Sequence, residues 1–379
     1  MNSQIPLSFP VFNGNENQYT QQAISSGHIA TNGSFISRFE EKLSARLKTH
    51  ECVALNSGTS ALHISLVLLG ISSGDEVICQ SFTFCASANP VVYLGATPIF
   101  VDSEKDTWNI CPELLEDAIL SRLAKGKKPK AIVVVHLFGM PARMNEILEV
   151  AEKYGIPVLE DAAEAIGSEF EGRPCGTLGQ IGVFSFNGNK IMTSGAGGAL
   201  ISTDSSIIQR AKLLSTQARE DFPFYHHLEI GYNYKMNNIS AAIGLAQLEQ
   251  LDMFIKNRRA VNQRYRELLE DFPGIEFQPE GKQSYSNYWL TSILIDQEIT
   301  GFSNDQLKFA LSKQGIESRY LWKPLHTQPV FNLTPFYGGS ISEGLFETGL
   351  CLPSSAGLTL EDQEKVVNVL QEELSKTHK

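Results

Sequence analysis

A lysine and a carboxylate in this sequence each follow a short apolar stretch that is typical of a buried strand. Lys190 stands in a polar, glycine-containing turn after Gly182–Phe186, and Asp161 follows Ile156–Leu159 about thirty residues upstream. An amine and a buried carboxylate at the ends of neighbouring strands suit pyridoxal phosphate (PLP). The amine forms a Schiff base with the cofactor aldehyde, and the carboxylate keeps the pyridine nitrogen protonated, so that the ring can accept electrons.

A lysine in a surface loop is the competing interpretation of Lys190, because most lysines are exposed. The apolar strand before Lys190 and the glycines after it, Gly195, Gly197 and Gly198, argue against this interpretation. Ser185, five residues before the lysine, can add a hydrogen bond to a phosphate where the strand ends.

The composition is that of a soluble protein with two domains. The chain has 379 residues, of which 42% are hydrophobic and 19% charged, and this length exceeds one small core. No apolar run approaches the roughly 18 residues of a membrane span, and no secretory signal pattern is visible, so we expect a cytoplasmic protein without membrane contact. A net charge of −11 disfavours non-specific binding to nucleic acid.

The six cysteines are scattered along the chain, and none forms a CxxC pair. No histidine cluster has the spacing of zinc ligands. Buried, reduced thiols and no metal site are therefore expected.

Strand and helix patterns alternate between residues 50 and 205, which predicts an α/β fold with a parallel sheet covered by helices. The expected strands are Glu76–Gln80, Thr97–Val101, Ala131–Val135, Pro157–Leu159, Gly182–Phe186 and Gly198–Ser202. The expected helices are Thr59–Leu69, Cys85–Leu94, Pro112–Leu123, Met144–Tyr154 and one long helix over 239–271. We expect a large domain of residues 1–255 and a smaller α+β domain of residues 256–379.

A turn of small residues, Asn56–Ser60, leads into the first of these helices. Gly58 would let the backbone approach a ligand, and the first-turn N–H groups with the Thr59 and Ser60 hydroxyls could hold a phosphate. Simple capping of the helix by Ser57 or Thr59 explains the same residues, and taken alone it is the favoured interpretation.

Asp161 and Glu164 are separated by two alanines, which leave room for a flat ring near the backbone. Asp161 would pair with the ring nitrogen, and Glu164 would lie near the ring face or its phenolic oxygen. A helix cap with an acid three residues later is an equally good interpretation. Phe84 could place its ring against the cofactor, although an aromatic residue at such a place more often belongs to the core.

Cations and aromatic side chains mix in the segment 317–326, which suits an anionic ligand with a ring, such as a nucleotide diphosphate. Trp322, Lys323 and His326 of this segment, together with Arg219, are the candidate contacts to such a ligand. A solvated loop with one anchoring tryptophan has about equal weight. For Asn233, spacing alone assigns no role.

Taken together, these segments resemble the PLP-dependent nucleotide-sugar aminotransferases of the DegT/DnrJ/StrS type. The resemblance extends over essentially the whole chain and rests on seven segments: Asn56–Leu62, Gly74–Ile78, Gly95–Pro98, Glu160–Ala165, Phe184–Lys190, Gly231–Met236 and Pro324–His326. It implies PLP fold type I (aspartate aminotransferase-like), a large domain with a mixed, mostly parallel sheet and a smaller α+β C-terminal domain.

The same resemblance assigns site roles. Lys190 is implied as the Schiff-base lysine and Asp161 as the partner of the pyridine nitrogen. Phosphate contacts are implied for Gly58, Thr59 and Ser185, a cofactor contact for Glu164, and stacking on the ring for Phe84. Asn233 matches a residue that the second subunit supplies, which implies a homodimer with shared active sites.

The sequence departs from the commoner pattern of that family at two places. Asn187 stands where many members have histidine, and Ala196 where many have glutamate. These changes make Asn187 a candidate for orienting the sugar. The form of the lysine segment, with Ser215–Glu220 and Leu350–Ser354, looks most like the UDP-4-keto-6-deoxy-N-acetylhexosamine aminotransferases of the bacillosamine pathway. A lysine at position 190 favours transamination, since related 3-dehydratases have histidine there.

The expected reaction transfers an amino group from L-glutamate to C4 of a UDP-linked 4-keto-6-deoxy sugar. Three alternatives remain open. They are the same chemistry on a dTDP- or GDP-linked keto sugar at C3 or C4, a PLP-containing regulator without turnover, and a different PLP reaction such as cysteine desulfuration. The last would need a reactive cysteine on a mobile loop, whereas Cys351 lies in an apolar segment.

Overall fold

The computed structural model describes residues 4–12, 14–48 and 51–377. An eight-stranded sheet forms its centre, with the strand order β1-β9-β8-β5-β4-β2-β3-β14. These strands are Glu51–Leu55 (β1), Glu76–Gln80 (β2), Thr97–Val101 (β3), Ala131–Val135 (β4), Val158–Asp161 (β5), Ile181–Ser185 (β8), Gly198–Ser202 (β9) and Phe336–Tyr337 (β14). β1 and β9 pair antiparallel at one edge, and β9 pairs antiparallel with β8, while the pairs from β8 to β14 are parallel.

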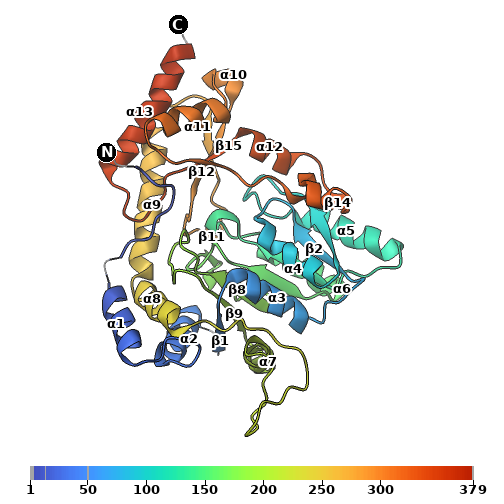
Figure 1. Cartoon of the computed structure of the whole chain (residues 1–379). Helices are drawn as coiled ribbons and strands as arrows, with labels where there is room; N and C mark the ends of the chain where they lie inside the picture. Colours follow the sequence, from blue (N-terminus) through green and yellow to red (C-terminus); the bar gives the residue numbers. More distant parts are fainter. Residues whose placement is uncertain (1–3, 13, 49–50, 378–379) are drawn as a thin grey trace.

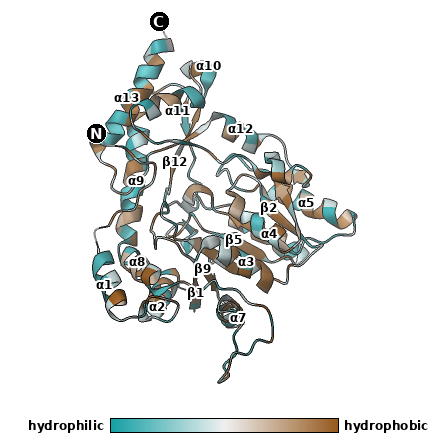
Figure 2. Cartoon of the chain, in the orientation of Figure 1, coloured by the Kyte–Doolittle hydropathy of each residue, from teal (hydrophilic) through white to brown (hydrophobic). Residues whose placement is uncertain are grey.

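Helices cover both faces of this sheet (Figure 1), because strands buried on both sides present apolar side chains alternately to each face. On β2, Val77 and Cys79 join the core beneath one helical layer, and Ile78 joins the core beneath the other. The first layer contains Gly58–Leu68 (α3), Asn89–Tyr93 (α4) and Ser205–Ser215 (α7), and the second contains Pro112–Ala124 (α5) and Met144–Tyr154 (α6). Apolar residues concentrate between these layers (Figure 2).

The C-terminal part has its own sheet of Ile275–Phe277 (β10), Thr291–Ile295 (β12), Arg319–Tyr320 (β13) and Gly349–Leu352 (β15). Helices Asn304–Lys313 (α11) and Leu360–Thr377 (α13) and the long helix Leu251–Leu268 (α9) lie beside it (Figure 1). The smaller helices are Gln297–Thr300 (α10) and Ile341–Thr348 (α12). A third sheet joins Ser284–Tyr285 (β11) to Glu169–Phe170 (β6) and Arg173–Pro174 (β7).

The mixed, mostly parallel sheet expected for the large domain is confirmed. The division between residues 255 and 256 stays a prediction, and α9 runs through this point without a break. Two segments also cross between the parts. Ile5 forms a bridge with Ile316, and β14 adds the edge strand of the large sheet.

Two of the predicted helices are each interrupted in the structure, so these predictions were wrong about a single continuous helix. The expected helix over 239–271 is two helices, Asn238–Glu249 (α8) and α9, because Gln250 leaves helical geometry at φ −103° and ψ 2°. The expected helix Cys85–Leu94 is a short 3₁₀ turn, Cys85–Ser87, followed by α4. Pro90 explains this break, since it has no N–H to continue the hydrogen bonds of the turn before it.

No sequence prediction covered the N-terminal helices Glu16–Ser25 (α1) and Ser34–Leu47 (α2), which pack against α8. Among the described residues, no helix is long and apolar enough to cross a membrane. The cytoplasmic location stays a prediction.

Candidate active site

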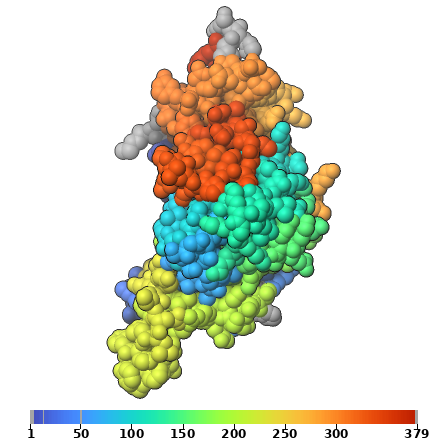
Figure 3. All heavy atoms as spheres, turned by 90° about the vertical axis from the view of Figure 1, so that its right-hand side faces the viewer, coloured from blue at the N-terminus to red at the C-terminus, as the bar shows by residue number. Residues whose placement is uncertain are grey.

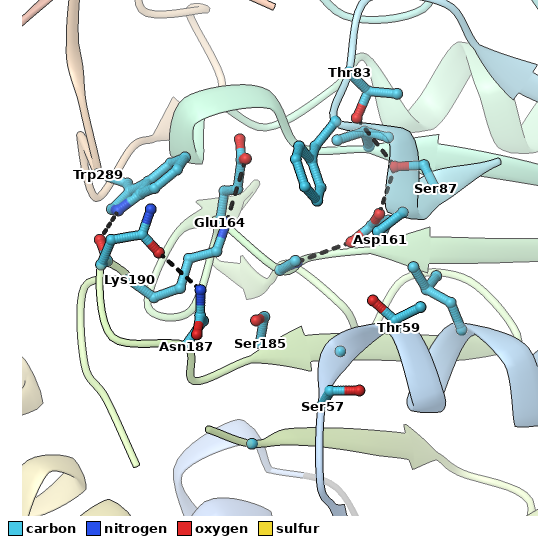
Figure 4. A pocket seen from close by; sticks show the side chains of 18 of the residues that line it. Ser57, Thr59, Thr83, Ser87, Asp161, Glu164, Ser185, Asn187, Lys190 and Trp289 are labelled. Atoms are coloured by element: carbon cyan, nitrogen blue, oxygen red, sulfur yellow. Dashed lines mark hydrogen bonds and ion pairs between the residues drawn. The ribbon is translucent and has the colours of Figure 1, made fainter. Parts of the chain in front are cut away.

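A cavity of about 310 Å³ lies where the carboxyl ends of β5 and β8 meet the N-terminus of α3. This is the edge at which sheets of this kind collect ligands, because loops diverge there and leave backbone and side-chain groups free. Figure 4 shows that Lys190 and Glu164 lie on one side of the cavity and Asp161 and Thr59 on the other.

Lys190 reaches the cavity from the loop that follows β8. The loop is closed by the N–H groups of Phe186 and Ser194, which donate to Gly197 O at 2.8 Å and to Phe186 O at 2.9 Å. The Lys190 Nζ atom lies 3.4 Å from Glu164 Oε1 and 3.9 Å from the centre of the Trp289 ring. Its side chain is 13% exposed, so the surface-lysine interpretation does not hold.

Asp161 is the last residue of β5, and its carboxylate is buried at the cavity wall. Oδ2 accepts a hydrogen bond from Ser87 Oγ at 2.7 Å, and Oδ1 accepts one from the Ala163 N–H at 3.2 Å. Burial raises the pKa of this carboxyl, although both hydrogen bonds and the charge of Lys190 act in the opposite direction. A cationic N–H donor beside this buried carboxylate would stabilise its ionised form.

Glu164 is also buried, and burial raises its pKa too, while Lys190 and the Phe138 N–H lower it. That N–H donates to Glu164 Oε2 at 2.7 Å. Two carboxylates thus share one amine, so a second positive group in the cavity would lower the cost of keeping both carboxylates ionised.

The N-terminus of α3 forms the opposite wall. Ser57 Oγ caps the helix by accepting the Ser60 N–H at 3.0 Å, and helix geometry leaves the N–H groups of Gly58 and Thr59 without partners inside the helix. A Cβ on Gly58 would lie 2.9 Å from Ser185 Cβ, so glycine permits the close approach of the turn to β8. These groups make a site suited to an anion.

The residues around the cavity fit PLP. Lys190 can bond its aldehyde, Asp161 can hold a protonated ring nitrogen, and the α3 turn with Ser185 can bind its phosphate. A protonated ring nitrogen would also supply the second positive group that the two carboxylates require.

Nine residues proposed from the sequence line this cavity: Gly58, Thr59, Phe84, Asp161, Glu164, Ser185, Asn187, Lys190 and Trp322. Their individual roles stay predictions. Five others lie elsewhere: Ser60, Arg219, Asn233, Lys323 and His326.

Two of these five are held by neighbouring residues. The Ser60 hydroxyl donates to Asn56 Oδ1 at 2.6 Å. The His326 ring stacks on Phe336 with centroids 3.6 Å apart, and its Nδ1 lies 2.7 Å from Ser81 Oγ. His326 therefore fastens its loop to the end of β2.

The other three are exposed and are not among the residues that line the cavity of their own chain. Asn233 is exposed, and its Oδ1 accepts a hydrogen bond from Gln217 Nε2 at 3.0 Å. The exposed Arg219 guanidinium lies 4.6 Å from the Tyr225 ring centre. Lys323 is exposed.

Sequence reasoning missed three cavity residues that contact the predicted ones: Ser87, Asn189 and Trp289. Ser87 lies 74 residues before Asp161, to which it donates. Trp289 lies 99 residues after Lys190 in the sequence. No local spacing could link these pairs, because the fold alone brings them together.

Comparison with known proteins identifies the group to which this site belongs. The profile of the DegT/DnrJ/EryC1/StrS aminotransferase family matches residues 11–371. EpsN of Bacillus subtilis strain 168 is 45% identical over 374 residues, covering 98% of this chain and 96% of that protein. GDP-perosamine synthase of Escherichia coli O157:H7 is 38% identical over 357 residues, covering 94% and 95%.

A solved structure gives the same result. A sugar aminotransferase of Streptococcus pneumoniae in its PLP form matches with a TM-score of 0.90 and 26% identity, covering 99% of this chain and 100% of that one. Fold type I, PLP as cofactor and aminotransferase activity, all expected from the sequence, are confirmed by these matches. The chain belongs to the DegT/DnrJ/EryC1/StrS aminotransferase family, whose members are PLP-dependent sugar aminotransferases.

Proposed function

We propose that this aminotransferase moves an amino group from L-glutamate to C4 of a UDP-linked 4-keto-6-deoxy-N-acetylhexosamine. The observation that carries the proposal is the position of Lys190 Nζ, which lies 3.4 Å from Glu164 in the same cavity as the buried Asp161. An amine at this place can transfer protons at the carbon atoms of a substrate, while Asp161 can hold the proton on the ring nitrogen of the cofactor.

When bound, PLP supplies a ring that takes up the electron pair left at a substrate carbon. Lys190 Nζ would remove the proton from the α-carbon of glutamate and later deliver a proton to C4 of the sugar. The Asp161 carboxylate would hold the proton on the ring nitrogen, and the hydrogen bonds from Ser87 and Ala163 would fix its orientation.

A GDP-linked 4-keto sugar is the second candidate substrate. It is favoured by the likeness to GDP-perosamine synthases from three bacteria, at 36–38% identity over 94–98% of this chain. Asn187 and Trp322 both line the cavity, and we expect them to distinguish the sugar.

Cysteine desulfuration is disfavoured by the surroundings of Cys351. This residue is buried in β15, and burial raises the pKa of its thiol to about 12. A reactive cysteine needs the opposite, an accessible thiolate.

The second subunit is proposed to complete each site. Residues 217–231 form an arm that projects from the body (Figure 3). Several of its apolar side chains are exposed. Phe224, Tyr225, Leu228 and Ile230 are 62%, 78%, 73% and 86% exposed. Such a patch on one chain supports association with a second copy, and Asn233 at the base of the arm would then enter the partner's cavity.

Replacing Lys190 by alanine should abolish amino transfer, with a loss of about a thousandfold or more, because no other lysine of the described residues lines the cavity. Turnover of glutamate with a keto sugar and the visible absorbance of the bound cofactor measure this. Lys153→Ala is the control, since that lysine is 61% exposed and pairs with Glu116 at the surface. Near-normal transfer by Lys190→Ala would contradict the assignment.

Asp161→Asn should lower turnover about a hundredfold or more, because a neutral amide cannot stabilise a positive ring nitrogen. Ser87→Ala keeps the carboxylate and removes one hydrogen bond, so it should lose far less. Rates of the glutamate half-reaction in single-turnover experiments separate the two. Equal losses in both variants would show that orientation, rather than charge, is what Asp161 provides.

A panel of 4-keto nucleotide sugars tests the substrate. Enzyme first reduced with glutamate should aminate the UDP-linked N-acetyl sugar at C4 with the highest kcat/KM. Product mass and NMR identify the nucleotide, the carbon and the stereochemistry. Preference for the GDP-linked sugar would select the second candidate, and inertness toward every keto sugar would overturn both.

Hybrid dimers test the shared site. A dimer of one Lys190→Ala chain and one Asn233→Asp chain has one intact site if Asn233 acts across the interface. It should therefore regain about half of the wild-type activity, whereas each parent homodimer stays nearly inactive. Differently tagged chains allow the hybrid to be purified and assayed. No recovery in a verified hybrid would place Asn233 in its own chain's site, and an active Asn233→Asp homodimer would place it outside both sites.

A further inference from the structure

The Lys190 amine lies between a carboxylate and the face of an indole ring. Glu164 Oε1 is 3.4 Å away, and the face of the Trp289 ring is 3.9 Å away (Figure 4). A cation over an indole face is attracted by the ring electrons, and the attraction is larger when water is excluded. Trp289 is 1% exposed, so water has little access to the ring.

Trp289 is itself fixed at its side chain and at both ends of its backbone unit. Its Nε1 donates to Asn189 O at 2.7 Å, and its backbone N–H donates to Asn287 Oδ1 at 2.8 Å. Its carbonyl accepts a hydrogen bond from Nη1 of the buried Arg258. The ring therefore has little freedom to follow the lysine.

Asn287 and Asn189, which fix Trp289, also hold Glu164 and the loop that carries Lys190. Asn287 Nδ2 donates to the backbone carbonyl of Glu164 at 2.9 Å. Asn189 O, which belongs to the residue before Lys190, accepts a second hydrogen bond from Ser8 Oγ at 2.6 Å. The carboxylate, the indole and the lysine loop are thus joined through the N-terminal segment and the C-terminal part of the chain.

We propose that Trp289 is a positioning residue that holds the Lys190 amine at a fixed place whenever it is not bonded to the cofactor. During amino transfer the freed amine must take up a proton and return one at a defined place, whereas an unrestrained lysine side chain has many rotamers. The indole face and Glu164 together restrict it to one end of the cavity. This inference rests on the proposed catalytic role of Lys190.

The test compares Trp289→Leu with Trp289→Phe and Ser8→Ala. In single turnovers with glutamate, Trp289→Leu should lower the maximal rate about tenfold to thirtyfold while the apparent KM for glutamate changes less than about threefold. Trp289→Phe keeps a ring face and loses the N–H, so it should lie between. Ser8→Ala leaves the indole in place and should show a loss of about twofold to threefold in the same direction.

A second readout does not depend on turnover. Protein stripped of cofactor is mixed with PLP, and borohydride trapping with mass spectrometry follows attachment at Lys190. In that step the amine condenses with the aldehyde and one water is released. Trp289→Leu should slow attachment while equilibrium binding of the phosphate-bearing cofactor stays close to wild type.

Tyr285→Leu is the matched control, because Tyr285 also lies beneath a cation, Arg259, but at the surface. Thermal unfolding identifies any variant that fails to fold. If Trp289→Leu fails to fold, the rates of Ser8→Ala test the proposal instead. An unchanged rate of both steps in Trp289→Leu, or an increase in KM alone, would overturn the proposal. Loss of all glutamate reactivity in the wild-type protein would instead overturn the proposed function.

Discussion

The parallel pairing of β5 with β8 is the constraint on which the site depends. Asp161 lies opposite Val183 in this pairing, so the carboxyl end of one strand and the loop after the other open at the same edge. The carboxylate and the lysine, twenty-nine residues apart in sequence, come to the same cavity for this reason. The apolar residues that bury both strands also exclude water from this edge of the sheet. Electrostatic interactions between charges there are therefore stronger than in water.

Burial creates the chemical character of the cavity. Asp161 and Glu164 both have raised pKa values because they are desolvated, and Lys190 is the one lysine among the described residues that line the cavity. A cavity with this imbalance favours a ligand that carries a positive nitrogen and, at its other end, a negative phosphate for the α3 turn. Glu160, next to Asp161, has a different task, since its carboxylate accepts hydrogen bonds from the N–H groups of Gly176, Leu178 and Gly179 and from the His136 ring. The acidic segment thus divides into one structural residue and two residues of the site.

The C-terminal part closes the site that the large sheet opens. Trp289 and Trp322 enter the cavity from this part, and Phe84 lies against Trp322 with ring centres 5.3 Å apart. Arg258 on α9 donates to the carbonyl of Trp289 and to Ser8 of the N-terminal segment. A movement of the C-terminal part would therefore reach the lysine loop directly, through hydrogen bonds and not through a flexible linker.

The amino-acid sequence predicted the chemistry of the site, because the strand patterns before Asp161 and Lys190 indicate burial and strand ends, and the Asn56–Ser60 turn indicates the start of a helix. The central strands Glu76–Gln80, Thr97–Val101 and Ala131–Val135 were predicted with their observed bounds. In Ala131–Val135 the nearly continuous branched apolar residues are typical of a strand buried on both faces. Only the tertiary structure shows which side chains surround the lysine and which of the residues proposed from the sequence lie outside the cavity. Trp289, Ser87 and Ser8 meet their partners across long separations, and His326 is held against Phe336. Periodicity records only which face of an element is buried, whereas these contacts depend on how several elements pack at one place.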